Sequence, residues 1–238
     1  MRIDARGNDE LRCVEIIPNI NKFAEGSALI RCGNTHVLCC ASVEDRTPPH
    51  VPMGEGWVTA EYSMLPRANR ERSRRDVSKL KLSPRSAEIQ RLVGRALRAC
   101  VDMKALGEHN ITIDCDVLQG DGGTRTASVT GGFVALALAC RKLVEEGKIE
   151  KMPLTGFVAA VSAGIVKDEV LLDLCYEEDS SAQVDLNCVM NDKGELIEIQ
   201  GTGEGRAFTV EEQRALVEIC AKGIRELHKI QKDIIGEL

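Results

Sequence analysis

Residues 114–132, with the sequence DCDVLQGDGGTRTASVTGG, limit the possible folds of this chain most strongly. Just before and within this stretch, apolar residues alternate with polar ones, as in a half-buried strand; they are Ile111, Ile113, Cys115 and Val117. After the glycines, apolar residues recur at helical spacing; they are Val129, Phe133, Val134, Ala137 and Leu138. The chain is therefore predicted to pass directly from a sheet strand into a helix.

The turn between this strand and helix has the composition of an anion site. It contains Gly120, Asp121, Gly122, Gly123, Thr124 and Arg125. Glycine allows the backbone to approach a ligand closely, and free N–H groups at the start of a helix attract negative charge. Thr124 adds a hydroxyl group and Arg125 a bidentate guanidinium. We expect this elbow to bind phosphate, although an ordinary strand-to-helix turn has the same local pattern. It is not a P-loop, because the Gly-Lys-Ser/Thr ending is missing.

The composition points to a globular protein with an aliphatic core. The 238 residues suffice for one domain or for two fused halves, and only 3% of them are aromatic. The first residues, MRIDARGNDELR, are charged, and the longest apolar run, 133–140, has eight residues where a membrane span needs about 20. We expect a soluble, cytoplasmic protein without a membrane partner. The ten cysteines include no CxxC pair, so mostly buried, reduced thiols are expected rather than zinc ligands or disulfides.

The net charge of −6 is distributed unevenly. Residues 67–98 contain eleven Lys and Arg against three acids, a local charge of +8, so the other 206 residues carry −14. A concentrated basic segment on an acidic body is typical of a protein that binds a polyanion through its phosphates. A solvated helix face with surface salt bridges has the same pattern and stays open as an alternative.

The first half of the chain is rich in predicted strands. Alternating and β-branched residues predict strands at 14–20, 28–32, 35–44 and 57–63. Residues 66–82 have almost no apolar period and many charges, which predicts a mobile loop that orders on a partner. Pro84 then opens an amphipathic helix and places Arg85 in its first turn, where free N–H groups also point. Arg85 is therefore predicted to share an anion with the elbow.

The second half follows the same order of elements, although the sequence shows no clear repeat. Strands are predicted near 156–166, 170–175, 183–190 and 195–201, before a long final helix. Thr209 and Glu212 form a capping box at the start of this helix. We predict an α+β fold of duplicated strand-and-helix units, with sheets packed on helices, in one compact domain over residues 1–238. Its N-terminal half, 10–145, carries the elbow, and its C-terminal half, 155–238, carries an acidic cluster.

The acidic cluster has the sequence EEDSSAQVD at 177–185, with Asp173 slightly upstream. On the predicted strand, Asp185 shares a face with Gln183 and Asn187. Acids on such a strand and on the loop entering it can converge on one magnesium ion or act as a general acid. Solvent-facing loop acids without a role are the alternative, since Asp and Glu are common surface residues.

Eight segments carry a likeness to a known family: 9–12, 24–28, 33–35, GWVTAEYSMLPRA at 56–68, EIQRLVGRALRA at 88–99, IDCDVLQGDGGTRTAS at 113–128, 179–185 and QGT at 200–202. Over nearly its whole length the chain resembles the bacterial ribonuclease PH family of phosphate-dependent exoribonucleases and transfer-RNA nucleotidyltransferases. The resemblance implies that phosphate is bound by Arg85, Gly123, Thr124 and Arg125. It implies that Asp179 and Asp185 are the catalytic and metal-binding acids, with Mg²⁺ or Mn²⁺ as the metal.

The charged loop at residues 66–82, called the basic loop below, is expected to contact RNA through Arg67, Arg70, Arg72, Arg74 and Arg75. Four positions depart from the family pattern: Ala5 and Pro84 stand where glycine is usual, Gly120 replaces alanine, and Gln183 replaces glutamate. Ala5 bears on the tight turn at the N-terminus, and Pro84 fixes the approach to Arg85. None of the four removes a chemical group from the proposed centre.

The resemblance implies phosphorolysis, in which phosphate attacks the last phosphodiester of an RNA 3′ end and releases a nucleoside 5′-diphosphate. The reverse reaction adds nucleotides. The resemblance further implies that precursor transfer RNA is the substrate and that the protein forms a homohexameric ring built as a trimer of dimers. Two other classes stay open: a non-catalytic, RNA-holding subunit of an exosome-type ring, and a magnesium-dependent hydrolytic nuclease. Polynucleotide phosphorylase is disfavoured, since 238 residues leave no room for its appended RNA-binding domains.

Overall fold

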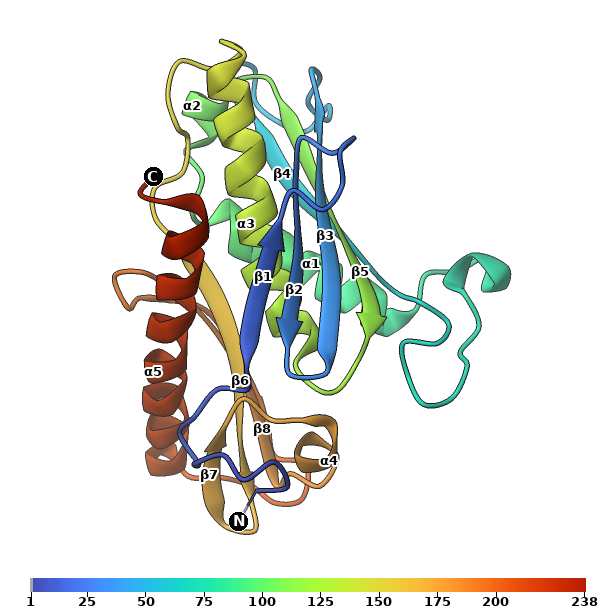
Figure 1. Ribbon diagram of the computed structural model, residues 1–238, viewed down its shortest axis with the longest axis vertical. Coiled ribbons are helices and arrows are strands. Elements are labelled where there is room, and N and C mark those ends of the chain that lie inside the picture. Colours follow the sequence, from blue (N-terminus) through green and yellow to red (C-terminus); the bar gives the residue numbers. More distant parts are fainter. Residues whose placement is uncertain (1) are drawn as a thin grey trace.

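Two β-sheets pack against a long central helix in the computed structural model (Figure 1). The structure describes residues 2–238, except for the side chains of Val77 and Lys79. The chain first forms β1 (Val14–Pro18), β2 (Gly26–Cys32), β3 (Thr35–Glu44), β4 (Trp57–Met64), the short 3₁₀ turn η1 (Asp76–Lys79), α1 (Pro84–Arg98), α2 (Met103–Leu106), β5 (Asn110–Gln119) and α3 (Thr124–Glu145). It continues with β6 (Val158–Val166), β7 (Glu169–Leu172), α4 (Tyr176–Asp179), β8 (Val184–Asn191), β9 (Leu196–Thr202) and α5 (Val210–Ile235).

The first sheet has five strands in the order β1-β2-β3-β5-β4. Neighbouring strands are antiparallel except β4 and β5, which run parallel. A parallel pair needs a crossover connection, and the segment containing α1 supplies it. Helices α1 and α3 bury their apolar side chains against this sheet. The elbow at the start of α3 therefore lies at the end of the strand β5, as the alternation before it predicts.

The second sheet has four antiparallel strands in the order β7-β6-β8-β9. Because side chains alternate along a strand, Val161 on β6 and Leu186 on β8 pack toward α5, while Ala160 and Val189 join the core around α3. Helix α3 covers only part of the sheet face that carries Ala160 and Val189. The remainder of the face carries polar side chains and forms one wall of the cavity described below.

Helix α3 approaches the first sheet closely at two glycines. A Cβ atom on Gly26 of β2 would lie 2.1 Å from the carbonyl oxygen of Ala135, and one on Gly131 of α3 would lie 2.7 Å from Cγ2 of Ile30. By length and composition α3 resembles a membrane span, but 78% of its apolar window is buried inside the protein. Its apolar surface is thus used to pack the two sheets on one helix.

The predicted α+β fold is confirmed, and the strand boundaries differ from expectation where the backbone turns. The first strand ends at Pro18 rather than at 20, since Asn19 has a φ of 57°. The strand predicted to 175 ends at Leu172, because Asp173 has a φ of 52° and leaves the sheet. The short helices α2 and α4 were not predicted.

The predicted helix starts are confirmed. Pro84 is the first residue of α1, with Ser83 as its N-cap. Thr209 and Glu212 form both hydrogen bonds of the capping box that opens α5. The cysteines also agree with expectation, since all ten, which lie within residues 2–238, are free and eight of them are buried.

Replacing Gly26 by alanine should destabilise the fold, because its methyl group would collide with the backbone of α3. We expect the free energy of unfolding to fall by about 2–3 kcal/mol or more, as for overpacked cores. Urea unfolding measures this loss. Gly205→Ala is the matched control, since its Cβ would meet its nearest neighbour at an ordinary 3.4 Å. A Gly26→Ala protein as stable as the Gly205→Ala protein would contradict the close helix–sheet contact.

Candidate active site

A cavity of about 340 Å³ lies between the elbow at the start of α3 and the polar part of the second sheet. All six residues predicted for phosphate binding, metal binding and catalysis line it: Arg85, Gly123, Thr124, Arg125, Asp179 and Asp185. The sequence prediction did not assign a role to the other lining residues, which are Ser162, Ser180, Ala182, Asn187 and Glu204. The fold thus brings the basic and the acidic candidates, more than 50 residues apart in sequence, into one chamber.

The elbow owes its shape to two glycines in the left-handed region. Gly122 has a φ of 74° and Gly123 a φ of 65°, which an L side chain rarely adopts. A Cβ on Gly122 would also lie 2.5 Å from the carbonyl oxygen of Leu174, in the turn after β7. Gly123 caps α3 without a side chain, so the first N–H groups of a 22-residue helix remain available for an anion. The Thr124 hydroxyl is held at 2.9 Å from that of the buried Tyr62.

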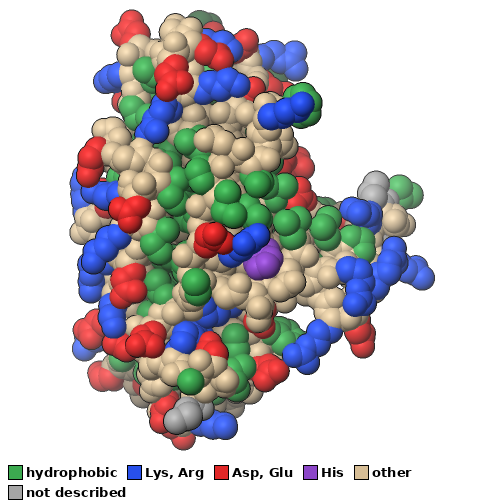
Figure 2. All heavy atoms as spheres, viewed as in Figure 1, with side chains coloured by type: hydrophobic (Ala, Val, Ile, Leu, Met, Phe, Trp, Pro, Cys, Tyr) green, Lys and Arg blue, Asp and Glu red, His purple; other side chains and the backbone are tan. Residues whose placement is uncertain are grey.

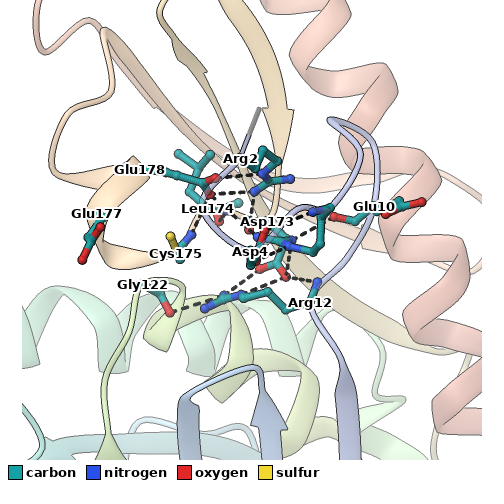
Figure 3. Close-up of polar contacts among 12 residues, drawn as sticks. Arg2, Asp4, Glu10, Arg12, Gly122, Asp173, Leu174, Cys175, Glu177 and Glu178 are labelled. Carbon is teal, nitrogen blue, oxygen red and sulfur yellow. Dashed lines mark hydrogen bonds and ion pairs between the residues drawn. The ribbon is translucent and has the colours of Figure 1, made fainter.

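Arg12, to which the sequence prediction gave no role, holds the elbow in place through hydrogen bonds. Its Nε and Nη2 atoms donate to the two carboxylate oxygens of Asp173 at 3.0 and 2.7 Å (Figure 3). Its Nη1 donates to the carbonyl oxygen of Asp121 at 2.6 Å. Burial opposes the ionisation of Asp173, but Arg12 outweighs it, so the pKa of Asp173 is lowered. This pair joins the elbow to the turn that follows β7.

The N-terminal segment fastens the other side of that turn. Arg2 donates from Nε and Nη2 to Glu178 of α4, at 2.8 and 2.7 Å (Figure 3). Ala5 forms the turn of this segment with a φ of 62°, and its N–H donates to the carbonyl oxygen of Arg2 at 3.1 Å. The tight turn is therefore kept although alanine replaces the usual glycine. Since Glu178 precedes Asp179, the Arg2 contact holds the helix that carries one of the candidate acids.

The two acids reach the cavity from different elements. Asp179 is the last residue of α4, and Asp185 lies on β8. Burial, and then the nearby Asp179 carboxylate, raise the pKa of Asp185 to about 6. Burial also raises the pKa of Asp179, although Arg85 and Arg125 act against it. The pair therefore carries negative charge at a cost in free energy that a cation in the cavity would reduce.

A divalent cation fits this pair of acids. One oxygen of Asp185, Oδ2, accepts a hydrogen bond from Asn187 at 3.2 Å, while the buried Oδ1 has no partner within residues 2–238. Mg²⁺ is commonly held by only one or two carboxylates, with waters and substrate phosphates completing its shell. Among the described residues, no group of three or more His, Cys, Asp or Glu is placed to hold a metal ion by itself, so a cation here would depend on Asp179, Asp185 and the substrate.

Asp185 and Asn187 share the cavity face of β8, as the alternation predicted. Gln183 does not join them, and this part of the prediction was wrong. It precedes the strand, and its side-chain amide forms two hydrogen bonds with Asp168 in the β6–β7 turn. Position 183, where this chain has glutamine instead of the usual glutamate, is thus not part of the cavity lining.

The two candidate arginines differ in their surroundings. Arg85 is exposed in the first turn of α1 at the edge of the cavity. Arg125 is more enclosed, with 17% of its side chain exposed, and its Nη1 donates to Glu88 at 3.2 Å and to Gln200 at 2.5 Å. Neither partner was predicted as a site residue, although both belong to segments that carried the family resemblance, Glu88 to 88–99 and Gln200 to 200–202.

The basic loop projects from the body between β4 and α1, and Figure 2 shows Lys and Arg side chains gathered on it. Its five candidate RNA-binding residues are all exposed: Arg67, Arg70, Arg72, Arg74 and Arg75. Ala68 fastens one end of the loop by accepting a hydrogen bond from the N–H of Gly120 at 2.9 Å. Arg70 reaches Glu177 of α4 at 3.2 Å, so the loop lies near the acidic side of the cavity. Its predicted mobility stays a prediction.

Comparison with known proteins places the chain in a family. A model of the "3' exoribonuclease family, domain 1" matches residues 10–142, and the model of domain 2 of the same family matches residues 156–222. Among solved structures, the chain is similar to an archaeal exosome core, with 25% identity, a TM-score of 0.77 and coverage of 97% of this chain and 91% of that one. It is also similar to the Archaeoglobus fulgidus exosome with RNA bound to the active site, with 25% identity, a TM-score of 0.79 and coverage of 96% and 91%.

The fold extends to more distant proteins. Rice (Oryza sativa) Rrp46 shares 18% identity with a TM-score of 0.77, and the match covers 98% of both chains. Because the two family models together match well over half of the residues, the chain belongs to the 3′ exoribonuclease family.

Proposed function

We propose that this protein is a phosphorolytic 3′→5′ exoribonuclease that trims precursor transfer RNA and, in reverse, adds nucleotides to RNA 3′ ends. One observation carries the proposal: a single cavity combines a basic, glycine-rich elbow with a pair of carboxyl groups. A hydrolytic nuclease would need the acids, but it would leave the elbow N–H groups and the two arginines without a role. Inorganic phosphate as a second substrate accounts for both halves of the cavity.

In this reaction an oxygen of phosphate attacks the phosphorus of the last phosphodiester, and the bond from that phosphorus to the 3′ oxygen of the preceding nucleotide breaks. The products are a nucleoside 5′-diphosphate and an RNA shortened by one nucleotide. Arg85, Arg125 and the elbow N–H groups hold phosphate in line with the scissile bond. One carboxyl group of the acid pair protonates the leaving 3′ oxygen.

The acid pair would also hold the metal. Asp179 and Asp185 are the residues that would bind Mg²⁺ or Mn²⁺, and the orphaned Oδ1 of Asp185 is the atom best suited to it. When bound, such an ion supplies positive charge against the charge that develops on the phosphate oxygens. Asn187 contributes by fixing the orientation of the Asp185 carboxylate.

The exposed arginines of the basic loop would grip the RNA body through its phosphates, at a distance from the cavity that trims the 3′ end. One loop is a small basic patch on an acidic protein. A hexameric ring, built as a trimer of dimers, would bring several such loops to one substrate and raise their effective concentration. The similarity to exosome structures, one of which holds RNA, supports a ring that binds RNA.

A non-catalytic RNA-holding subunit is the second candidate, and the likeness to the exosome core and to Rrp46 favours it. Such a subunit would have no use for both acids and both arginines in one cavity. The following two experiments separate the candidates.

Short RNA incubated with the protein and Mg²⁺ should release nucleoside 5′-diphosphates only when phosphate is added. Thin-layer or liquid chromatography identifies the products, and sulfate replaces phosphate in the control. Nucleoside monophosphates formed without phosphate would indicate a hydrolase, and an absence of any product would favour the non-catalytic subunit.

Arg125→Ala and Asp185→Ala should fail in different ways. Loss of the Arg125 guanidinium removes charge-assisted hydrogen bonds to phosphate, so the KM for phosphate should rise about 10-fold to 100-fold, with RNA affinity nearly unchanged. Loss of the Asp185 carboxylate should lower kcat by about 10²-fold or more while both substrates still bind. Steady-state kinetics and fluorescence anisotropy measure these effects. An Asp185→Ala enzyme with ordinary kcat would move the chemistry elsewhere.

The acid pair should reduce stability as the pH rises. The pKa of Asp185 is about 6 in the folded protein against an ordinary value of 3.8, so the folded state binds more protons between these values. The free energy of unfolding therefore falls as the pH rises from about 4 to about 6. Asp185→Asn removes this loss and should be more stable than the wild type at pH 7.5, by at most about 3 kcal/mol, but not at pH 4. Urea unfolding with a chelator and without phosphate measures it.

Asp233→Asn, at an exposed position on α5, controls for the loss of a carboxylate. A stability difference for Asp185→Asn that is the same at pH 4 and pH 7.5 would contradict the raised pKa.

A further inference from the structure

The guanidinium of Arg125 is held by two residues that belong to neither the elbow nor the acid pair. Its Nη1 atom donates to Oε1 of Glu88 on α1 at 3.2 Å and to Oε1 of Gln200 on β9 at 2.5 Å. The amide of Gln200 also approaches Glu88, with Nε2 3.5 Å from the same carboxylate oxygen. Three elements that are distant in sequence therefore meet at one nitrogen atom.

Counting donors shows what this arrangement leaves free. A guanidinium has five N–H groups, and both contacts use the two on Nη1. Within residues 2–238, Nε and Nη2 of Arg125 have no hydrogen-bond partner, although the residue lines the cavity. Nε and Nη2 form the edge of the fork that binds two oxygens of a phosphate or carboxylate side by side.

We propose that Glu88 and Gln200 are positioning residues that hold Nη1 of Arg125 so that its Nε–Nη2 edge is presented to phosphate. This inference rests on the proposed phosphorolytic function. A long, flexible arginine side chain loses much of its freedom when it grips an anion. Prior fixation by Glu88 and Gln200 reduces that loss, so the two residues act on phosphate affinity without touching phosphate.

Glu88 could also weaken phosphate binding through its charge, and this effect has to be separated from its positioning of Arg125. Its carboxylate is negative, and a negative charge beside the site repels phosphate and neutralises part of the charge on Arg125. If charge alone mattered, removing Glu88 would tighten phosphate binding. If positioning dominates, removing Glu88 weakens binding, and glutamine at the same position restores it, because an amide oxygen accepts the same hydrogen bond.

The chain offers a matched control for the loss of a contact between α1 and β9. Arg95 of α1 donates from Nε and Nη2 to Glu198 of β9 at 3.1 and 2.7 Å. This pair joins the same two elements as the contact between Glu88 and Gln200, but it does not involve Arg125. Glu198→Ala therefore reports what a weaker α1–β9 contact does on its own.

The experiment measures phosphate affinity by titration calorimetry, and the KM for phosphate and kcat by steady-state assay. Glu88→Ala should weaken phosphate binding about tenfold or more and raise KM to match, with kcat changed little. Gln200→Ala should weaken binding about threefold to tenfold, while Glu88→Gln and Glu198→Ala should stay within about threefold of the wild type. Thermal unfolding of each variant confirms that it folds.

A double-mutant cycle shows whether the effect passes through Arg125. In an Arg125→Ala background, Glu88→Ala should cause no further loss of phosphate affinity. The inference is overturned if Glu88→Ala binds phosphate as well as or better than the wild type, or if Glu198→Ala weakens binding as much. A wild-type protein that neither binds nor requires phosphate would instead overturn the proposed function, so the two failures are distinct.

Discussion

The site depends on the buried ion pair between Arg12 and Asp173. Both side chains are about 5% exposed, so both charges give up most of their hydration, a cost of several kcal/mol for each ion. Two charge-assisted hydrogen bonds, a third from the backbone N–H of Arg12 and one from Arg12 to the carbonyl of Asp121 offset this cost. Since Arg12 precedes β1 and Asp173 follows β7, the pair sets how the phosphate elbow and the acid pair face each other.

Two residues with positive φ values shape the backbone around the Arg12–Asp173 pair. Asp173 takes a positive φ, which ends β7 and turns its carboxylate toward Arg12. Gly122, also at positive φ, lets the elbow lie directly on the carbonyl of Leu174 in the next turn. Glycine adopts this conformation freely, but at Asp173 it costs free energy and persists because surrounding contacts determine it. Arg12 supplies those contacts to Asp173, so the one strained residue of this turn is held by the same ion pair that links it to the elbow.

Local patterns in the sequence were enough for most elements and for the anion-binding residues, while the family resemblance singled out Asp179 and Asp185 from the acidic cluster; neither identified the contacts between these residues. Alternation located the strands, Pro84 and the capping box at Thr209 located two helix starts, and the elbow pointed to an anion. Asp173 and Arg12 are 161 residues apart, and Gln200 and Arg125 are 75 apart. Periodicity reports on neighbours within a few turns, so no local signal identifies such partners. Gln183 was misplaced for the same reason, since its partner Asp168 lies in another turn.

The distribution of satisfied and unsatisfied groups explains how such a site is ready for a ligand. Strong pairs surround the cavity, with Arg12 bound to Asp173, Arg2 to Glu178, and Nη1 of Arg125 to Glu88 and Gln200. Among the residues that line the cavity, Nε and Nη2 of Arg125 and Oδ1 of Asp185 have no hydrogen-bond partner within residues 2–238. Rigid surroundings with unpaired groups inside reduce the reorganisation that a charged ligand requires. Binding then satisfies donors and acceptors that the fold itself has left free.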